Sequence, residues 1–122
     1  MNKNPSETSE QVAVAKLLRA ARPKILWTAT ANGGERHLKT AIALKASGVQ
    51  AGVPDLLIFS PPPVGGWVGA AIEMKRRGAP PSAWEDHQRE WASDLVGCGW
   101  WAGVAYGSDE AIELLRALGY RL

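Results

Sequence analysis

Hydrophobic positions along the chain follow two spacings, and segments of the two kinds alternate. Short apolar runs rich in β-branched and aromatic residues predict β-strands. These runs cover residues 24–32, 55–60, 67–75 and 100–106. Segments with apolar residues three or four positions apart predict amphipathic helices. These segments cover residues 10–21, 35–47, 83–96 and a last stretch that begins at a capping Ser108 or Asp109 and runs to Leu118.

The element order that results, α-β-α-β-β-α-β-α, favours a three-layer α/β sandwich built on a four-stranded mixed sheet. Only a loop rich in proline and glycine, residues 61–66, separates the second and third strands. We therefore expect these two strands to form an antiparallel hairpin. The fourth strand follows a helix, so it is expected to return parallel to the third strand by a right-handed crossover.

Three charged residues stand out in the two central strands. Glu73 and Lys75 interrupt an otherwise apolar strand, and Asp55 opens the strand before it. Side chains alternate between the two faces of a strand, so Glu73 and Lys75 share a face. The midpoint of positions 55 and 73 is 64, which falls inside the loop. A hairpin centred there places Asp55 directly opposite Glu73 on the same face.

Two carboxylates that face each other repel unless a positive charge lies between them. A divalent cation fits this arrangement, because Mg²⁺ binds one or two carboxylates together with water and phosphate oxygens. Lys75 could then orient or deprotonate a water, or stabilise charge that builds on a phosphate. The simpler alternative is that Asp55 only begins a strand and that Glu73 and Lys75 form an exposed ion pair. The apolar context favours the metal site, since buried charges need partners.

The same residues belong to a longer series of motifs. The series is Asn32-Gly33-Gly34-x-Arg36, Gly52-Val53-Pro54-Asp55-Leu56, Ile72-Glu73-Met74-Lys75, and Gln88 followed by Trp91 and Leu95. In order and spacing it resembles the virus-type replication-repair nuclease (VRR-NUC) family, a branch of the PD-(D/E)XK phosphodiesterases. The resemblance runs from about Glu7 to Tyr120 and implies a restriction-endonuclease-like core.

The resemblance also implies roles for individual residues. Asp55 and Glu73 match the metal-ligating acids of the family, and the backbone carbonyl of Met74 is expected to assist them. Lys75 matches the catalytic lysine, and Gln88 matches a glutamine close to the site.

The family also carries an acid on its first helix, followed four residues later by glutamine. This pattern selects Glu7, which precedes Gln11, as a further metal ligand. Glu10 remains the alternative, because Ser6 could cap the helix and make Glu7 an ordinary acid of the first turn.

The activity implied is a Mg²⁺- or Mn²⁺-dependent endonuclease that cuts DNA, with branched DNA such as four-way junctions as the expected substrate. Short members of the family resemble bacterial or phage proteins that act as homodimers in DNA repair, recombination or phage replication. Two alternatives stay open: a DNA-structure-binding protein that does not cut, and a restriction-like endonuclease that reads a duplex sequence.

Composition is consistent with one cytoplasmic domain. The 122 residues suit a single domain, residues 1–122, whose first five residues are expected to be loosely ordered. Cys98 is the only cysteine, which excludes an internal disulfide. The polar N-terminal residues do not form a secretory signal.

Basic residues are concentrated in the first half of the chain. Residues 16–45 contain seven Lys or Arg and one acid, whereas residues 78–122 contain three Lys or Arg and seven acids. The asymmetry indicates a surface that meets phosphate, although a solvated helix surface would look the same. The candidates for contact with nucleic acid are Arg36, Lys39, Lys45, Arg76 and Arg77. Pairing with an acid is the alternative for Arg36 and for the arginines that follow Lys75. His87 is expected to be a surface residue.

Overall fold

The computed structural model describes residues 4–30 and 38–122. Within these residues the predicted order of helices and strands is confirmed, with one short 3₁₀ helix added, η1. The elements are α1 (Glu7–Ala20), β1 (Trp27–Ala29), α2 (Leu38–Ala46), β2 (Leu56–Ile58), β3 (Ala70–Lys75), η1 (Pro81–Ala83), α3 (Asp86–Gly97), β4 (Trp101–Tyr106) and α4 (Ser108–Ala117).

The four strands form one mixed sheet in the order β1-β2-β3-β4. β2 pairs antiparallel with β3, and β4 runs parallel to β3, as predicted. β1 pairs antiparallel with β2, a pairing that the sequence analysis did not predict. Leu56 pairs with Ile72, and the midpoint of these positions is again 64. The predicted hairpin register is therefore confirmed, and its continuation by one residue sets Asp55 opposite Glu73.

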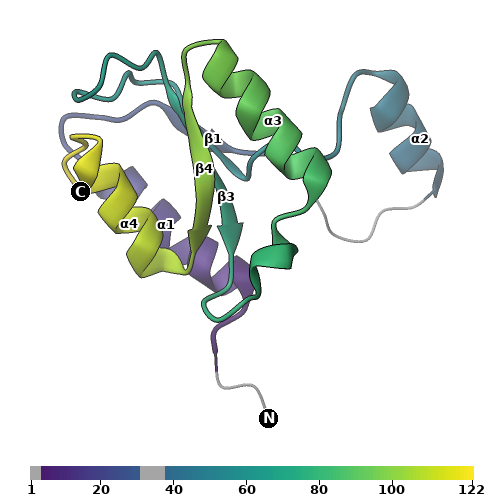
Figure 1. The fold of residues 1–122 in the computed structure, drawn as a ribbon, viewed down its shortest axis with the longest axis horizontal. Helices are drawn as coiled ribbons and strands as arrows, with labels where there is room; N and C mark the ends of the chain where they lie inside the picture. Colours follow the sequence, from purple (N-terminus) through teal and green to yellow (C-terminus); the bar gives the residue numbers. More distant parts are fainter. Residues whose placement is uncertain (1–3, 31–37) are drawn as a thin grey trace.

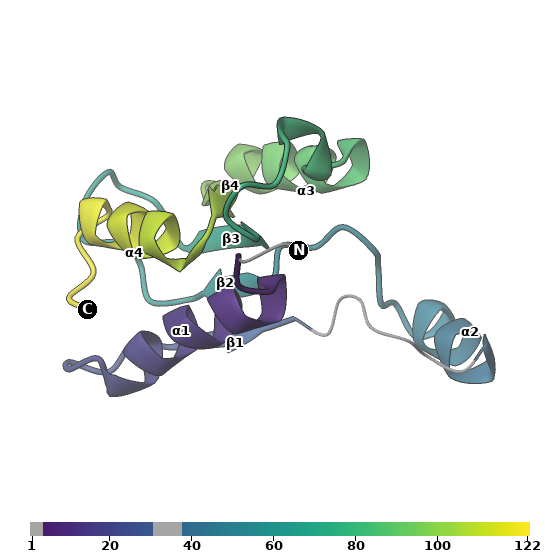
Figure 2. The ribbon, with the colours of Figure 1, turned by 90° about the horizontal axis from the view of Figure 1, so that it is seen from below.

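Helices cover both faces of the sheet. Figures 1 and 2 show α1 and α4 on one face and α3 on the other, whereas α2 stands away from the sheet. The core lies between the sheet and the α1–α4 pair, where Leu56, Ile72 and Met74 are fully buried. Because strand side chains alternate, Glu73 and Lys75, the residues that follow Ile72 and Met74 on β3, face the α3 side.

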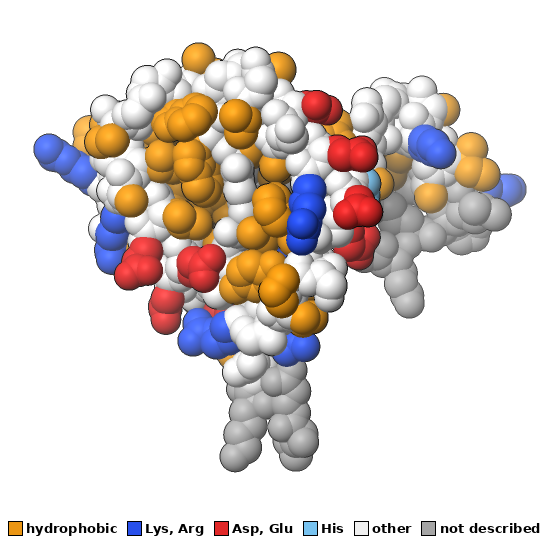
Figure 3. All heavy atoms as spheres, in the orientation of Figure 1, with side chains coloured by type: hydrophobic (Ala, Val, Ile, Leu, Met, Phe, Trp, Pro, Cys, Tyr) orange, Lys and Arg blue, Asp and Glu red, His pale blue; other side chains and the backbone are white. Residues whose placement is uncertain are grey.

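β4 is the outer strand of the sheet on the side that Figure 3 presents to the viewer. Hydrophobic side chains gather there over β4, between α3 and α4. All six residues of β4 are uncharged, and Ala105 is the buried one.

The six residues Ala70–Lys75 of β3 are buried throughout, because β3 has a strand on each side and helices on both faces. A charged side chain on β3 is therefore held away from bulk water.

Several predicted boundaries are wrong. β2 covers Leu56–Ile58 rather than residues 55–60, and β3 begins at Ala70 rather than at residue 67. The first strand, predicted from residue 24, begins only at Trp27 and ends at Ala29 within the described residues, although Ile25 before it is buried in the core. Residues 31 and 32 of the predicted strand lie outside the described residues. The last helix is capped by Gly107 and not by Ser108 or Asp109. Gly107 has a φ of 99°, a conformation that suits glycine, and Ser108 uses its hydroxyl to bond a carboxylate of α1 instead.

The first helix begins at Glu7, three residues before the predicted segment of residues 10–21. The Ser6 hydroxyl accepts a hydrogen bond from the Ser9 N–H at 3.1 Å, so Ser6 is the N-cap. Asn4 is also in place, because its side chain donates to the Arg77 carbonyl at 3.0 Å. Among the described residues, no helix has the length and apolar character needed to cross a membrane.

Candidate metal and catalytic centre

Three carboxylates from separate parts of the chain meet at one point. Glu7, Asp55 and Glu73 each offer an oxygen, and these oxygens lie within 4.8 Å of one another. Glu7 comes from the first turn of α1, Asp55 precedes β2 and Glu73 lies in β3. Asp55 and Glu73 are buried, at 8% and 5% exposed, while Glu7 is exposed. Such a group fits a divalent cation with oxygen ligands, which it would hold with one side open to solvent.

Asp55 is held by its backbone and by its side chain. Its carbonyl accepts from the Thr30 N–H at 2.8 Å, which ties the segment to the end of β1. Its carboxylate accepts from the Met74 N–H at 2.7 Å, inside the protein. The N–H and C=O of one strand residue point to the same side of the strand. The Met74 carbonyl is therefore directed toward the side on which Asp55 lies, and its role as an additional ligand stays a prediction.

The turn before Asp55 packs closely on α3. Gly52 has a φ of 94°, and a Cβ built there would lie 2.8 Å from the His87 ring and 3.0 Å from Trp91. Only glycine combines this backbone conformation with this approach. The Gly52-Val53-Pro54-Asp55 motif thus sets the distance between Asp55 and α3.

Lys75 lies beside the acids on the same face of β3. Its ammonium is 3.7 Å from Glu73, and the residue is 7% exposed. A buried lysine needs a polar partner, and the Glu73 carboxyl group supplies one. The lysine is therefore held next to the carboxylates instead of extending into solvent.

Gln88 connects α3 to the carboxylates. Its side-chain carbonyl accepts from the Glu85 N–H at 2.9 Å, as one half of a capping box at the start of α3. Its amide nitrogen donates to Glu73 at 3.4 Å. Both bonds require the same orientation of the amide, so Gln88 is a directed donor toward the site.

The carboxylates influence one another's protonation. Burial raises the pKa of Glu73 to about 9, and Asp55 adds to the rise through a side-chain hydrogen bond and its charge. Partial burial also raises the pKa of Glu7; Lys75 opposes this rise and Asp55 adds to it. Full ionisation of the three acids is therefore unfavourable in the metal-free protein, and a bound cation would make it favourable.

A cavity of about 270 Å³ opens beside this group. Its lining residues are Glu7, Ala51, Gly52, Val53, Asp55, Glu73, Glu85, His87 and Gln88. Sequence reasoning missed Glu85, and it placed His87 at the surface without connecting it to the site. His87 is exposed, but it lines the cavity, and its Nδ1 is 3.5 Å from Glu85. The spacing of Glu85 and Gln88, typical of a capping box, is the signal that would have placed this end of α3 at the site.

Glu10, the alternative helix acid, lies outside the group of three. It is 2% exposed and binds Arg77, whose Nε and Nη2 donate to its two oxygens at 2.8 Å each. The Ser108 hydroxyl donates to the same carboxylate at 3.1 Å. Hydrogen bonds from Arg77 are the main cause that lowers the pKa of Glu10 to about 2. The geometry thus brings Glu7, and not Glu10, to the other two acids.

The basic residues predicted to contact nucleic acid are spread over several positions. Lys39 and Lys45 are exposed on α2, and Arg76 is partly exposed just after β3. Arg77 pairs with Glu10, which corresponds to the alternative reading of this residue, and it also lies 3.8 Å from Asp109. Arg36 lies outside the described residues. A role in binding DNA stays a prediction for all five.

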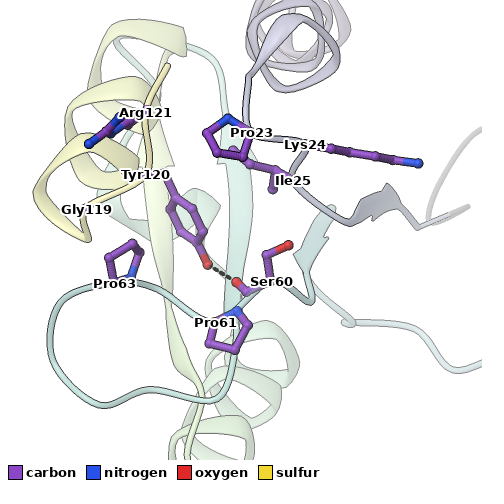
Figure 4. Close-up of a pocket in the computed structure, with 9 residues that line it drawn as sticks. All are labelled: Pro23, Lys24, Ile25, Ser60, Pro61, Pro63, Gly119, Tyr120 and Arg121. Carbon is purple, nitrogen blue, oxygen red and sulfur yellow. Dashed lines mark hydrogen bonds between the residues drawn. The ribbon is translucent and has the colours of Figure 1, made fainter.

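A second cavity, of about 370 Å³, has a different character. Figure 4 shows it between the segment at Pro23, the loop at Pro61 and Pro63, and the C-terminal Tyr120. The Tyr120 hydroxyl donates to the Ser60 carbonyl across it. Lys24 and Arg121 are part of its lining, but their side chains point away from it in Figure 4. With its apolar walls and no carboxylate among its lining residues, this cavity offers no counterpart to the carboxylate group.

A mixed four-stranded sheet that carries Asp55, Glu73 and Lys75 on its central hairpin defines the class, the PD-(D/E)XK nucleases. Within that class the chain belongs to the VRR-NUC family, whose domain model matches residues 5–109. It is also similar to a solved structure named "VRR_NUC domain protein". The two are 26% identical with a TM-score of 0.77, and the match covers 97% of this chain and 91% of that chain. Among curated protein sequences, none matches significantly.

Proposed function

We propose that this protein is a metal-dependent endonuclease that hydrolyses phosphodiester bonds of DNA. The observation that carries the proposal is the meeting of three carboxylates within 4.8 Å, next to a buried lysine 3.7 Å from Glu73. Phosphodiester hydrolysis needs charge stabilisation on the phosphate and an activated water at the same point. Three carboxylates that can hold a cation, with an ammonium beside them and a cavity next to them, could meet both requirements.

Glu7, Asp55 and Glu73 would hold a Mg²⁺ or Mn²⁺ ion, with the Met74 carbonyl as an additional oxygen ligand. When bound, such an ion polarises the phosphate and lowers the pKa of a coordinated water. The hydrogen bond from the Met74 N–H keeps one Asp55 oxygen oriented. Glu73, with a raised pKa, is the ligand that must lose its proton before it can bind a cation.

Lys75 and Gln88 act on the substrate side of this centre. The Lys75 ammonium would orient the attacking water or stabilise negative charge that develops on the phosphate during in-line attack. Gln88 holds the Glu73 carboxylate with its amide nitrogen and is itself fixed by the cap of α3. Both residues therefore preorganise the site before DNA arrives.

DNA would approach from the side of α2 and the end of β3. Lys39 and Lys45 on α2, Arg36 in the preceding segment, and Arg76 and Arg77 after β3 are the proposed phosphate contacts. The preferred substrate we propose is branched DNA, such as a four-way junction, processed by a homodimer in repair, recombination or phage replication. A dimer with two equivalent sites would allow symmetric cutting of two strands.

The test is cleavage of a labelled panel, comprising linear duplex, flap, fork and four-way junction, with Mg²⁺ and Mn²⁺ in parallel. We expect metal-dependent cutting with the highest rate on the junction. Glu73→Gln and Lys75→Met should each lower the single-turnover rate by about 100-fold or more. Glu113→Gln, an exposed acid on α4, is the matched control and should cut like the parent.

The same panel distinguishes the other readings. Junction binding without cutting under any metal would indicate a DNA-structure-binding protein, and cutting of linear duplex at fixed positions would indicate a restriction-like enzyme. Light scattering with and without junction DNA tests the homodimer, and a monomer under both conditions would contradict it.

A further inference from the structure

Three distant parts of the chain converge on the carboxylate of Glu10. This carboxylate accepts hydrogen bonds from the Arg77 N–H, Nε and Nη2 at 3.2, 2.8 and 2.8 Å. It also accepts from the Ser108 N–H and hydroxyl at 3.3 and 3.1 Å. Glu10 belongs to α1, Arg77 follows β3, and Ser108 begins α4. A carboxylate that is 2% exposed and accepts five hydrogen bonds holds its surroundings in one arrangement.

Neighbouring groups reinforce this hydrogen-bond network of Glu10, Arg77 and Ser108, called the Glu10 network below. Gly107 passes so close that a Cβ there would lie 3.1 Å from a Glu10 oxygen and 3.2 Å from the Arg77 Cβ. Asn4, just before α1, donates to the Arg77 carbonyl at 3.0 Å. The start of α1 is thus bound to the end of β3 from both sides of Glu7.

The Glu10 network lies close in sequence to residues of the carboxylate group. Glu7 lies three residues before Glu10 on α1, so the two share one helical turn. Lys75 and Glu73 lie on β3, two and four residues before Arg77, which follows the strand. The Glu10–Arg77 pair therefore joins the helix that carries Glu7 to the strand that carries Glu73.

Glu7 depends on this connection more than the other two acids do. Asp55 and Glu73 are buried and have hydrogen bonds of their own, from Met74 and Gln88. Glu7 is exposed at the helix start and reaches the other oxygens only if α1 is correctly placed. A displacement of α1 would move Glu7 away from Asp55 and Glu73, which are held by these bonds of their own.

We propose that Glu10 and Arg77 are positioning residues that set Glu7 within reach of the metal. The proposal rests on the metal-dependent function above, and it assigns to Arg77 a structural partner in addition to any contact with DNA. It predicts that the pair affects metal affinity through Glu7 and not through Asp55 or Glu73.

The test is a double-mutant cycle on Mn²⁺ affinity, measured by calorimetry on the full chain without DNA. Glu10→Gln should weaken Mn²⁺ binding about three- to ten-fold. This is at or below the roughly 10- to 100-fold typical of residues that bond a metal ligand directly, because Glu10 acts on Glu7 through α1. In a Glu7→Gln background the same substitution should change the affinity by less than about two-fold, because the coupled ligand is absent. Arg77→Gln should behave like Glu10→Gln, whereas Glu113→Gln should leave Mn²⁺ affinity unchanged.

An equal loss of Mn²⁺ affinity from Glu10→Gln with and without Glu7 would overturn the proposal, since the Glu10 network would then act on the whole site. An unchanged affinity in folded Glu10→Gln protein would also overturn it. If Glu10→Gln does not fold, Ser108→Ala and Arg77→Lys remove only part of the Glu10 network. Their effects on Mn²⁺ affinity should depend on Glu7 in the same way.

Failure of the proposed function has a different signature. In that case the parent protein binds no Mn²⁺ and cuts none of the DNA substrates. The placement of α1 is then read from hydrogen exchange of the metal-free protein, where Glu10→Gln should speed exchange of amides in residues 8–12. Unchanged exchange there would contradict the positioning role by itself.

Discussion

The backbone N–H of Met74 donates to the carboxylate of Asp55 at 2.7 Å, and the bond is buried. Asp55 is thus both a structural acceptor for β3 and one of three acids that face a common point. The two roles can be separated by substitution, because an asparagine side chain keeps an acceptor oxygen but loses the charge.

Asp55→Asn should abolish cleavage and weaken Mn²⁺ binding while retaining most of the folding stability. Asp55→Ala should lose activity in the same way and in addition lose about 1–3 kcal/mol of stability, because the Met74 N–H is left buried without an acceptor. Chemical denaturation of both variants measures the difference. Equal stability of the two would mean that the bond to Met74 contributes nothing.

The raised pKa of Glu73 predicts an unusual pH dependence for the metal-free protein. The folded state keeps the Glu73 proton up to about pH 9, whereas the unfolded chain releases it near 4.5. The contribution of Glu73 to stability is therefore complete below pH 4.5 and declines as the pH rises through this window. We expect the metal-free Tm to fall from pH 5 to pH 8, less steeply in Glu73→Gln than in the Glu113→Gln control.

Added Mn²⁺ should oppose that decline, because a cation binds the ionised carboxylate and not the protonated one. The rise in Tm caused by a fixed Mn²⁺ concentration should therefore be larger at pH 8 than at pH 5. Thermal scans with and without chelator measure it. A rise that is the same at both pH values would argue against Glu73 as a ligand.

The lowered pKa of Glu10 predicts a contribution to stability that is lost at acid pH, opposite to that of Glu73. Its folded pKa of about 2 is lower than its ordinary value of 4.5, mainly because of hydrogen bonds from Arg77. Its contribution to stability is therefore present above pH 4.5 and is lost as the pH falls toward 2. Glu10→Gln should reduce the loss of stability between pH 5 and pH 3, as measured by denaturation at each pH. Glu110→Gln, an exposed acid on α4, serves as the control and should retain the full loss.

Substitutions of Gln88 should separate its role in capping α3 from its hydrogen bond to Glu73. Gln88→Ala removes both of its bonds and should cost about 1 kcal/mol of stability as well as activity. Gln88→Glu can still accept from the Glu85 N–H but places a negative charge beside Glu73. We expect Gln88→Glu to fold with nearly parental stability and to cut DNA more slowly, which circular dichroism and single-turnover rates will show. Parental rates in Gln88→Glu would exclude a role for the amide nitrogen.

Much of the centre followed from the sequence because its parts are local. Alternation within β3 places Glu73 and Lys75 on one face, and a hairpin has a single midpoint that relates Asp55 to Glu73. The apolar and polar spacings also determined the order of helices and strands. These features depend on residues close in sequence or joined by one short loop.

Only the tertiary structure decided between Glu7 and Glu10. Both acids lie in the first turn and a half of α1, and helical spacing allows either to face the site. The choice depends on how α1 packs against β3 and α4, which brings Arg77 and Ser108 to Glu10 across 67 and 98 residues. The cavity wall at Glu85 and His87 likewise forms only when α3 packs on Gly52. The acid pair of the hairpin was therefore readable from the chain itself. Its third carboxylate was settled by the burial of Glu10 in an ion pair, which leaves Glu7 to face the other two acids.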